Sequence, residues 1–231
     1  MNINGKRLLD TIFTLGKIGI DAEGKRTRLA ASDTNKAGRD YVVSLMKELD
    51  LKVVVDHIGN IFGIWETPEN KTEQPFMVGS HIDTVINAGQ YDGCLGVLSG
   101  LEAIRTLKEN NVKTKRPLIV GVFTNEEGVR YTPDMMGSLV YAGGMSAKEA
   151  LAAVGTDGTI LGDELKRIGY AGTVEPGFVT PCAFVELHIE QGPILDVEGI
   201  NIGAVENLQG IHWQQVTIEG AANHAGTTPT K

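Results

Sequence analysis

The chain contains the stretch Gly79-Ser80-His81-Ile82-Asp83-Thr84-Val85, which is followed after five residues by Tyr91-Asp92-Gly93. This stretch joins an apolar run, 76–78, to a helical pattern that begins at Gly93. One histidine and two aspartates therefore lie at or just after the carboxyl end of a predicted strand, the edge at which open α/β sheets hold ligands. Imidazole nitrogen and carboxylate oxygen suit zinc, manganese, cobalt or nickel. The His-x-Asp motif alone is short, so a solvated loop is the competing interpretation. Asp92 also stands at the N-cap of the predicted helix, a role compatible with metal binding because one carboxylate oxygen can cap while the other binds the ion.

The composition indicates a soluble globular protein. Of the 231 residues, 42% are hydrophobic and 22% are charged, which is enough apolar material for a real core. The net charge of −8 and the lack of long Lys/Arg runs argue against nucleic acid or an anionic membrane as a partner. No signal-peptide pattern or membrane-length apolar stretch is evident, and two cysteines form no disulfide framework. We therefore predict a cytoplasmic protein.

Hydrophobic periodicity predicts an α/β fold, with a mixed central sheet flanked by helices. The expected helices span 4–15, 33–49, 93–107, 147–153 and 160–168. The expected strands span 51–56, 61–65, 76–80, 117–124, 183–191, 202–205 and 213–219. Gly96 and Gly100 lie inside one predicted helix, where glycine costs about 1 kcal/mol relative to alanine, and close packing against the sheet is a plausible reason.

Two further motifs with acidic or histidine side chains lie at predicted strands. Glu126 and Glu127 come directly after the strand 117–124, and His188 lies in the strand 183–191. If the strand 117–124 runs parallel to the strand 76–80, Glu126 and Glu127 lie at the same sheet edge as His81 and Asp92. His188 is expected to share one face of its strand with Glu186 and Glu190, because side chains alternate with period two. Adjacent carboxylates at a strand end are otherwise typical of a solvated loop.

Metal-assisted amide hydrolysis needs metal ions that polarise the carbonyl and lower the pKa of a water, and a nearby base that takes the proton. These residues supply the cation ligands and the base. Asp83, two residues after His81, is placed to accept the other imidazole N–H and to fix its tautomer. The residue types available are His81, Asp92 and His188 as ligands of one ion, Asp92 and Glu127 as ligands of a second ion, and Glu126 as the base.

Five motifs in order resemble the hydantoinase/carbamoylase branch of the M20 metallopeptidases, which includes N-carbamoyl-L-amino-acid hydrolases, allantoate amidohydrolases and β-ureidopropionases. The motifs are Gly-Ser-His-Ile-Asp-Thr-Val from 79, Tyr-Asp-Gly-Cys-Leu-Gly from 91, Thr-Asn-Glu-Glu-Gly-Val-Arg-Tyr from 124, Glu-Leu-His-Ile-Glu-Gln-Gly-Pro from 186 and Asn-His-Ala-Gly-Thr-Thr-Pro from 223.

The resemblance implies a metal-dependent, exopeptidase-like catalytic domain with two divalent ions (Zn, Mn, Co or Ni) and an inserted α+β lid domain that also forms a homodimer. It implies that His81, Asp92 and His188 hold one ion, that Asp92 and Glu127 hold the other, and that Glu126 activates a bridging water. It further implies that Gln191, Asn223 and His224 bind the substrate. Without the resemblance, the sequence favours Gln191 as a strand-end amide that bonds the backbone and His224 as an exposed loop histidine.

The resemblance also implies a later histidine for the second ion and a later arginine for the substrate carboxylate. We therefore expect 1–206 to be the N-terminal part of the catalytic domain and 207–231 to be the first strands of the inserted domain. This segment alone is expected to hold one ion or none and to be weakly active or inactive.

The predicted activity is hydrolysis of the carbamoyl C–N bond of a small N-carbamoyl amino acid or a ureido acid such as allantoate. The alternatives are an M20 aminoacylase or dipeptidase, or a catalytically incomplete fragment of such an enzyme.

Overall fold

The computed structural model describes residues 1–210, 214 and 216–229. It divides into two compact units, Met1–Ile189 and Glu190–Lys231. The first unit contains helices α1 (Gly5–Gly16), α2 (Asp33–Glu48), α3 (Cys94–Glu109), α4 (Met136–Tyr141), α5 (Ala147–Leu151) and α6 (Leu161–Arg167). Its strands are β1 (Lys52–Val55), β2 (Ile61–Trp65), β3 (Phe76–His81), β4 (Leu118–Phe123) and β5 (Ala183–Val185). The second unit contains α7 (Ile194–Glu198).

The five strands form one mixed sheet in the order β1-β2-β4-β3-β5. β1 pairs antiparallel with β2, and β2 antiparallel with β4. β3 runs parallel to both β4 and β5, with His81 opposite Phe123 and Phe76 opposite Ala183. The parallel arrangement brings the carboxyl ends of β3, β4 and β5 to one edge, so the condition for placing Glu126 and Glu127 at the edge of His81 and Asp92 is met. The predicted α/β class with a mixed, helix-flanked sheet is confirmed.

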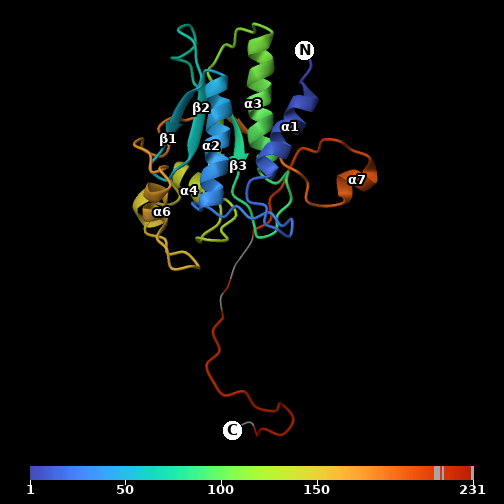
Figure 1. Ribbon diagram of the computed structural model, residues 1–231, viewed down its shortest axis with the longest axis vertical. Helices are drawn as coiled ribbons and strands as arrows, with labels where there is room; N and C mark the ends of the chain where they lie inside the picture. The colour runs from blue at the N-terminus through green and yellow to red at the C-terminus, as the bar shows by residue number, and fades with distance from the viewer. Residues whose placement is uncertain (211–213, 215, 230–231) are drawn as a thin grey trace. The chain divides into compact units, whose positions relative to one another are not determined.

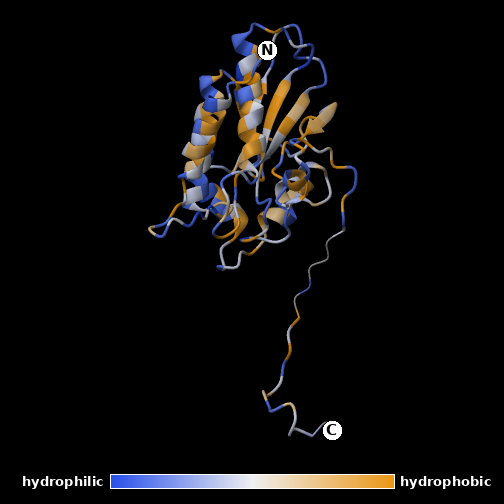
Figure 2. Ribbon diagram, turned by 90° about the vertical axis from the view of Figure 1, so that its right-hand side faces the viewer, coloured by the Kyte–Doolittle hydropathy of each residue, from blue (hydrophilic) through white to orange (hydrophobic). Residues whose placement is uncertain are grey.

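Helices α1, α2 and α3 cover one face of the sheet (Figures 1 and 2). Side chains alternate between the faces with period two, so Val120 and Val122 of β4 join the larger core under these helices. Ile119 and Phe123 point to the opposite face and join a smaller core with Phe62. Tyr141 of α4 packs on that face, with its ring centroid 5.4 Å from that of Phe62.

Local side-chain hydrogen bonds explain where α1 and α2 begin. The Asn4 side chain accepts a hydrogen bond from the Arg7 amide at the start of α1. The Ser32 hydroxyl accepts one from the Asn35 amide at the start of α2.

The predicted reason for the glycines of α3 is confirmed. A Cβ at Gly96 would lie 2.8 Å from the Leu187 carbonyl oxygen, and a Cβ at Gly100 would lie 2.6 Å from Val78 Cγ2. Only glycine lets the helix approach the sheet this closely.

One strand is much shorter than predicted. β5 ends at Val185, and the segment 186–191 has no regular secondary structure, so the expectation that His188 lies on a strand face is wrong. β5 pairs only with β3, and beyond Val185 the Ser80 hydroxyl of β3 donates a hydrogen bond to the Glu186 carboxylate. A side-chain contact therefore replaces the ladder where the edge strand stops.

The second unit lacks strands among its described residues, so the strand predicted over 202–205 is also wrong. Of the strand predicted over 213–219, residues 213 and 215 lie outside the described residues, and the others have no regular structure. A strand needs a neighbour to pair its backbone groups. The domain boundary predicted between 206 and 207 stays a prediction. Every helix in the described part of the chain is too short or too polar to cross a membrane.

Candidate metal centre

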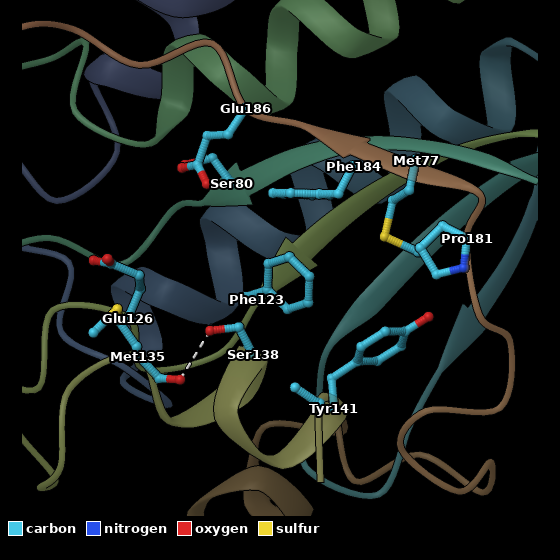
Figure 3. Close-up of a pocket in the computed structure, with 11 residues that line it drawn as sticks. Met77, Ser80, Phe123, Glu126, Met135, Ser138, Tyr141, Pro181, Phe184 and Glu186 are labelled. Carbon is cyan, nitrogen blue, oxygen red and sulfur yellow. Dashed lines mark hydrogen bonds between the residues drawn. The ribbon is translucent and has the colours of Figure 1, made fainter. Parts of the chain in front are cut away.

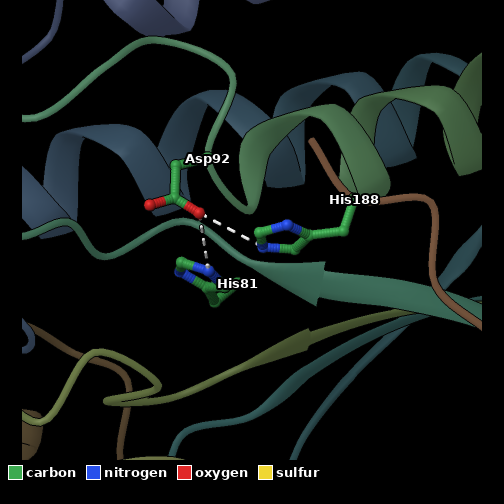
Figure 4. Close-up of side chains that lie close together, drawn as sticks. All are labelled: His81, Asp92 and His188. Atoms are coloured by element: carbon green, nitrogen blue, oxygen red, sulfur yellow. Dashed lines mark ion pairs between the residues drawn. The ribbon is translucent and has the colours of Figure 1, made fainter. Parts of the chain in front are cut away.

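Three potential ligands from separate parts of the first unit converge at the carboxyl edge of the sheet (Figure 4). The Asp92 Oδ1 atom lies 3.7 Å from His81 Nε2 and 3.2 Å from His188 Nε2. One ligand atom from each of the three residues lies within 4.8 Å of the others. His81 ends β3, Asp92 precedes α3, and His188 follows β5, so the sheet and helix together bring these residues into one cluster.

Backbone carbonyl groups orient both imidazole rings. His81 Nδ1 lies 2.9 Å from the Asp83 carbonyl oxygen, and His188 Nδ1 lies 2.8 Å from the Ile189 carbonyl oxygen. Each ring therefore presents Nε2 to Asp92, and metal-bound histidines are oriented by the same kind of hydrogen bond from their other nitrogen.

The predicted contact of Asp83 with His81 involves a different atom from the one expected. The Asp83 carboxylate accepts a hydrogen bond from the Glu127 amide at 3.1 Å, and the carbonyl of the same residue meets the imidazole. Asp83 is only 3% exposed, so its carboxylate is buried where that amide can satisfy it. It thereby connects the loop after β3 to the loop after β4.

The prediction that Asp92 caps α3 is wrong. The N-cap residue is Gly93, with φ of 61° and without a side-chain capping bond. The Asp92 carboxylate instead faces the two imidazoles. A Cβ at Gly93 would lie 2.5 Å from His81 Nε2, so the ring rests directly against this glycine.

Glu126 and Glu127, the predicted base and second-ion ligand, both lie beside the cluster. Glu126 Oε2 is 3.3 Å from His81 Nε2. Glu127 Oε1 accepts a hydrogen bond from the Val85 amide at 3.2 Å. Burial raises the pKa of Glu126, and burial together with the negative charge of Asp92 raises the pKa of Glu127 to about 7.

The remaining members of the cluster also have shifted pKa values. A hydrogen bond with Asp92 raises the pKa of His188 to about 9, and the same bond lowers the pKa of Asp92. Burial alone lowers the pKa of His81, but the negative charges of Asp83 and Glu126 outweigh it and raise this pKa overall. Acidic groups are therefore concentrated here, and a cation would offset their charge.

The donor set fits a divalent transition metal. Ions such as zinc bind imidazole nitrogen and carboxylate oxygen at about 2.0–2.2 Å, and the separations of 3.2 and 3.7 Å are ones that two ligands of a single ion can have. Two neutral imidazoles and one carboxylate suit zinc, manganese, cobalt or nickel alike.

A cavity of about 290 Å³ opens beside Glu126 (Figure 3). Glu126 and Glu186 lie at one end, and Met77 and Pro181 lie at the other. Much of its wall is apolar, with the rings of Phe123, Tyr141 and Phe184 among the lining residues. The cavity thus reaches from a polar end at the cluster across the sheet face that α4 partly covers.

Gln191, Asn223 and His224 belong to the second unit, so their role in substrate binding stays a prediction. Gln191 has a left-handed backbone, with φ of 55°. His224 lies at a turn, where its Nδ1 accepts a hydrogen bond from the Gly226 amide at 3.1 Å. All three side chains are exposed.

Sequence reasoning missed Arg28, which lies in a segment that reads as a polar loop. Its guanidinium is buried and contacts the segments that carry His81 and Asp92. No sequence pattern could have identified it, because most of its partners are backbone carbonyls, which every residue has.

Residues 77–230 match the model of peptidase family M20/M25/M40. The chain is 41% identical to an N-carbamoyl-L-amino-acid amidohydrolase from Rhizobium meliloti, covering 98% of this chain and 54% of that protein. It is 37% identical to allantoate deiminase from Arabidopsis thaliana, covering 94% of this chain and 42% of that protein. A crystal structure of a hydantoinase/carbamoylase family amidase from Burkholderia multivorans aligns with a TM-score of 0.82 at 43% identity, over 85% of this chain and 48% of that one. The chain spans about half the length of the curated relatives it matches.

Proposed function

This chain belongs to peptidase family M20/M25/M40, and we propose that it carries the metal-holding and proton-accepting residues of an amidohydrolase. The substrate is an N-carbamoyl amino acid or a related ureido acid such as allantoate. One observation above all supports the proposal: three ligand atoms converge beside the Glu126 carboxylate. The names of the relatives, which refer to N-carbamoyl-L-amino acids and to allantoate, support this substrate class.

In this proposal His81, Asp92 and His188 hold one divalent ion, and Asp92 with Glu127 contributes to a second. When bound, such ions polarise the ureido carbonyl and lower the pKa of water. Glu126 accepts the proton of the attacking water and returns it to the departing nitrogen. Its raised pKa suits this role, because general bases work best when their pKa lies near the working pH.

The other parts of the chain have supporting roles. The Asp83 and Ile189 carbonyls keep both imidazoles turned so that Nε2 faces Asp92. The cavity beside Glu126 offers a small ureido compound room next to that carboxylate. Gln191, Asn223 and His224 are proposed to bind the substrate. A cytoplasmic location and a homodimer of a longer chain remain proposals.

The test measures ammonia release from an N-carbamoyl-L-amino acid and from allantoate after reconstitution with Zn²⁺, Mn²⁺, Co²⁺ or Ni²⁺. N-acetyl amino acids and dipeptides are assayed in parallel. We expect weak turnover from this segment, and of the ureido compounds only, and Glu126→Gln should lower it by about 10²- to 10⁴-fold with the metal content unchanged. Glu175→Gln, at a carboxylate that is 80% exposed, is the matched control and should not change turnover.

Two results would contradict the proposal. A preference for N-acetyl amino acids or dipeptides would identify an aminoacylase or dipeptidase. Absence of turnover with all four metals, in a chain that binds them, would show that these residues do not suffice for the activity.

A further inference from the structure

Arg28 is a fully buried cation beside the candidate metal centre. Its exposed fraction is 0%. Among the described residues its guanidinium donates to carbonyl oxygens and to one thiol, not to a carboxylate. Burying a charge without an opposite charge is costly, and an apolar side chain usually serves a core position at least as well. The position of this arginine therefore calls for an explanation beyond packing.

Two nitrogens of the guanidinium contact the two ligand-bearing segments. Nε donates to the Ile82 carbonyl at 2.6 Å, directly after His81 in the chain. Nη2 donates to Cys94 Sγ at 3.2 Å, two residues after Asp92. A single rigid, planar group thus spans the distance between the end of β3 and the start of α3.

The backbone of Arg28 holds the same loop from its other side. The Arg28 amide donates to Thr84 Oγ1 at 2.9 Å, and the Thr84 amide donates to the Arg28 carbonyl at 3.1 Å. Nη1 anchors the far end of the side chain on the Ile18 carbonyl at 2.8 Å, just beyond α1. The loop 82–84 is therefore hydrogen-bonded to Arg28, and the Arg28 side chain is in turn hydrogen-bonded to the chain just beyond α1.

The neighbouring helix leaves room for this side chain. A Cβ at Gly38 of α2 would lie 2.8 Å from Arg28 Cδ. The glycine lets the arginine stem pass between α2 and the loop, so the buried cation is accommodated by the fold around it.

We propose that Arg28 is a positioning residue that sets the separation of His81 and Asp92 before an ion arrives. It acts through Ile82 and Cys94 and touches neither an ion nor the substrate. The inference rests on the proposed function only in taking the His81, Asp92 and His188 cluster as the ion site. Lysine cannot replace the arginine, because an ammonium group has no planar fork to span both acceptors.

The experiment titrates metal-free chain with Co²⁺ and records the affinity and the visible absorption spectrum, which reports the geometry of the bound ion. We expect Arg28→Lys to weaken binding of the first Co²⁺ by about 10- to 100-fold and to alter the spectrum. Loss of a residue that orients metal ligands without touching the ion typically has an effect of this size. Cys94→Ala, which removes only the contact on the Asp92 side, should shift affinity and spectrum in the same direction by a smaller amount. This milder variant decides the question if Arg28→Lys does not fold.

Arg39→Lys is the matched control for loss of a buried arginine. Arg39 is 1% exposed, and its guanidinium donates hydrogen bonds to Asn35, Gly59 and Thr124 rather than to the loops 82–84 and 92–94. It should lower the melting temperature yet keep the wild-type Co²⁺ spectrum. If the wild type binds Co²⁺ and both Arg28→Lys and Cys94→Ala bind it with the same affinity and spectrum, the positioning role is overturned and the proposed function stands. If the wild type binds no Co²⁺, the proposed function fails and this inference fails with it.

Discussion

At the residue scale, the cluster depends on a glycine as much as on its ligands. Gly93 has φ of 61°, a conformation that favours glycine, and it adjoins the His81 imidazole. A Cβ there would lie 2.5 Å from His81 Nε2, the atom that faces Asp92. The position thus combines a backbone conformation that would be strained for any residue with a Cβ and a space that has no room for a methyl group.

Gly93→Ala should therefore move the His81 ring and weaken metal binding by about 10- to 100-fold. Backbone strain should also cost about 1–2 kcal/mol of unfolding free energy. Isothermal titration with Zn²⁺ and chemical denaturation measure the two effects. Gly89→Ala is the control, because a Cβ at Gly89 meets nothing within 4 Å. Equal Zn²⁺ affinity in the two variants would show that the His81 ring tolerates the extra methyl group.

At the element scale, α3 holds the sheet and the cluster together. It begins just after Asp92, and Gly96 brings its first turn against Ser80 of β3 and the Leu187 carbonyl. Leu187 immediately precedes His188, so the distance between α3 and this segment sets where the second imidazole lies. The helix was predicted from its apolar spacing, and the close approach was predicted from its glycines. The group nearest to a Cβ at Gly96 is the Leu187 carbonyl, and its position depends on the path of residues 186–189, which were wrongly predicted to be a strand.

Gly96→Ala should destabilise the protein although alanine is the better helix former. The added Cβ would lie 2.8 Å from the Leu187 carbonyl oxygen, and such overpacking costs about 1–3 kcal/mol. That exceeds the gain in helix propensity, which is about 1 kcal/mol. Gly5→Ala in α1 is the matched control, since a Cβ there meets nothing within 4 Å, and it should be neutral or stabilising. Urea denaturation of both variants measures the difference; a stabilised Gly96→Ala would contradict the packing account.

At the scale of the whole molecule, an ion at the cluster would link three elements that are far apart in the sequence. His81 follows the core strand β3, Asp92 precedes α3, and His188 follows the edge strand β5, which pairs on one side only. An unfolded chain would not hold these three ligands together. Binding energy at this site should therefore appear as folding stability.

Adding Zn²⁺ to metal-free chain should raise its melting temperature, because an ion at about 100 times its dissociation constant contributes about 2.7 kcal/mol. His188→Ala should abolish this rise. His57→Ala is the matched control, at a histidine that lies 3.4 Å from Glu175 on the surface, and it should retain the rise. Differential scanning calorimetry with and without EDTA measures it. A full Zn²⁺ response in His188→Ala would place the ion elsewhere.

Strong periodicity in the sequence was enough to predict the main elements, and residue type was enough to predict the kinds of ligand. β2 matches its prediction at both ends, and α2 and β4 agree within one residue at each end. Because parallel strands share one carboxyl edge, the motifs after β3 and β4 could be placed together from the sequence pattern.

Three features of the site emerged only from the folded arrangement of the chain. The Asp83 carbonyl, not its carboxylate, meets His81; β5 ends before His188; and Arg28 connects the two ligand-bearing loops. The physical reason is that these features depend on distances between groups far apart in the chain. Many of these groups are backbone atoms common to all residues, so no local pattern identifies which of them will meet.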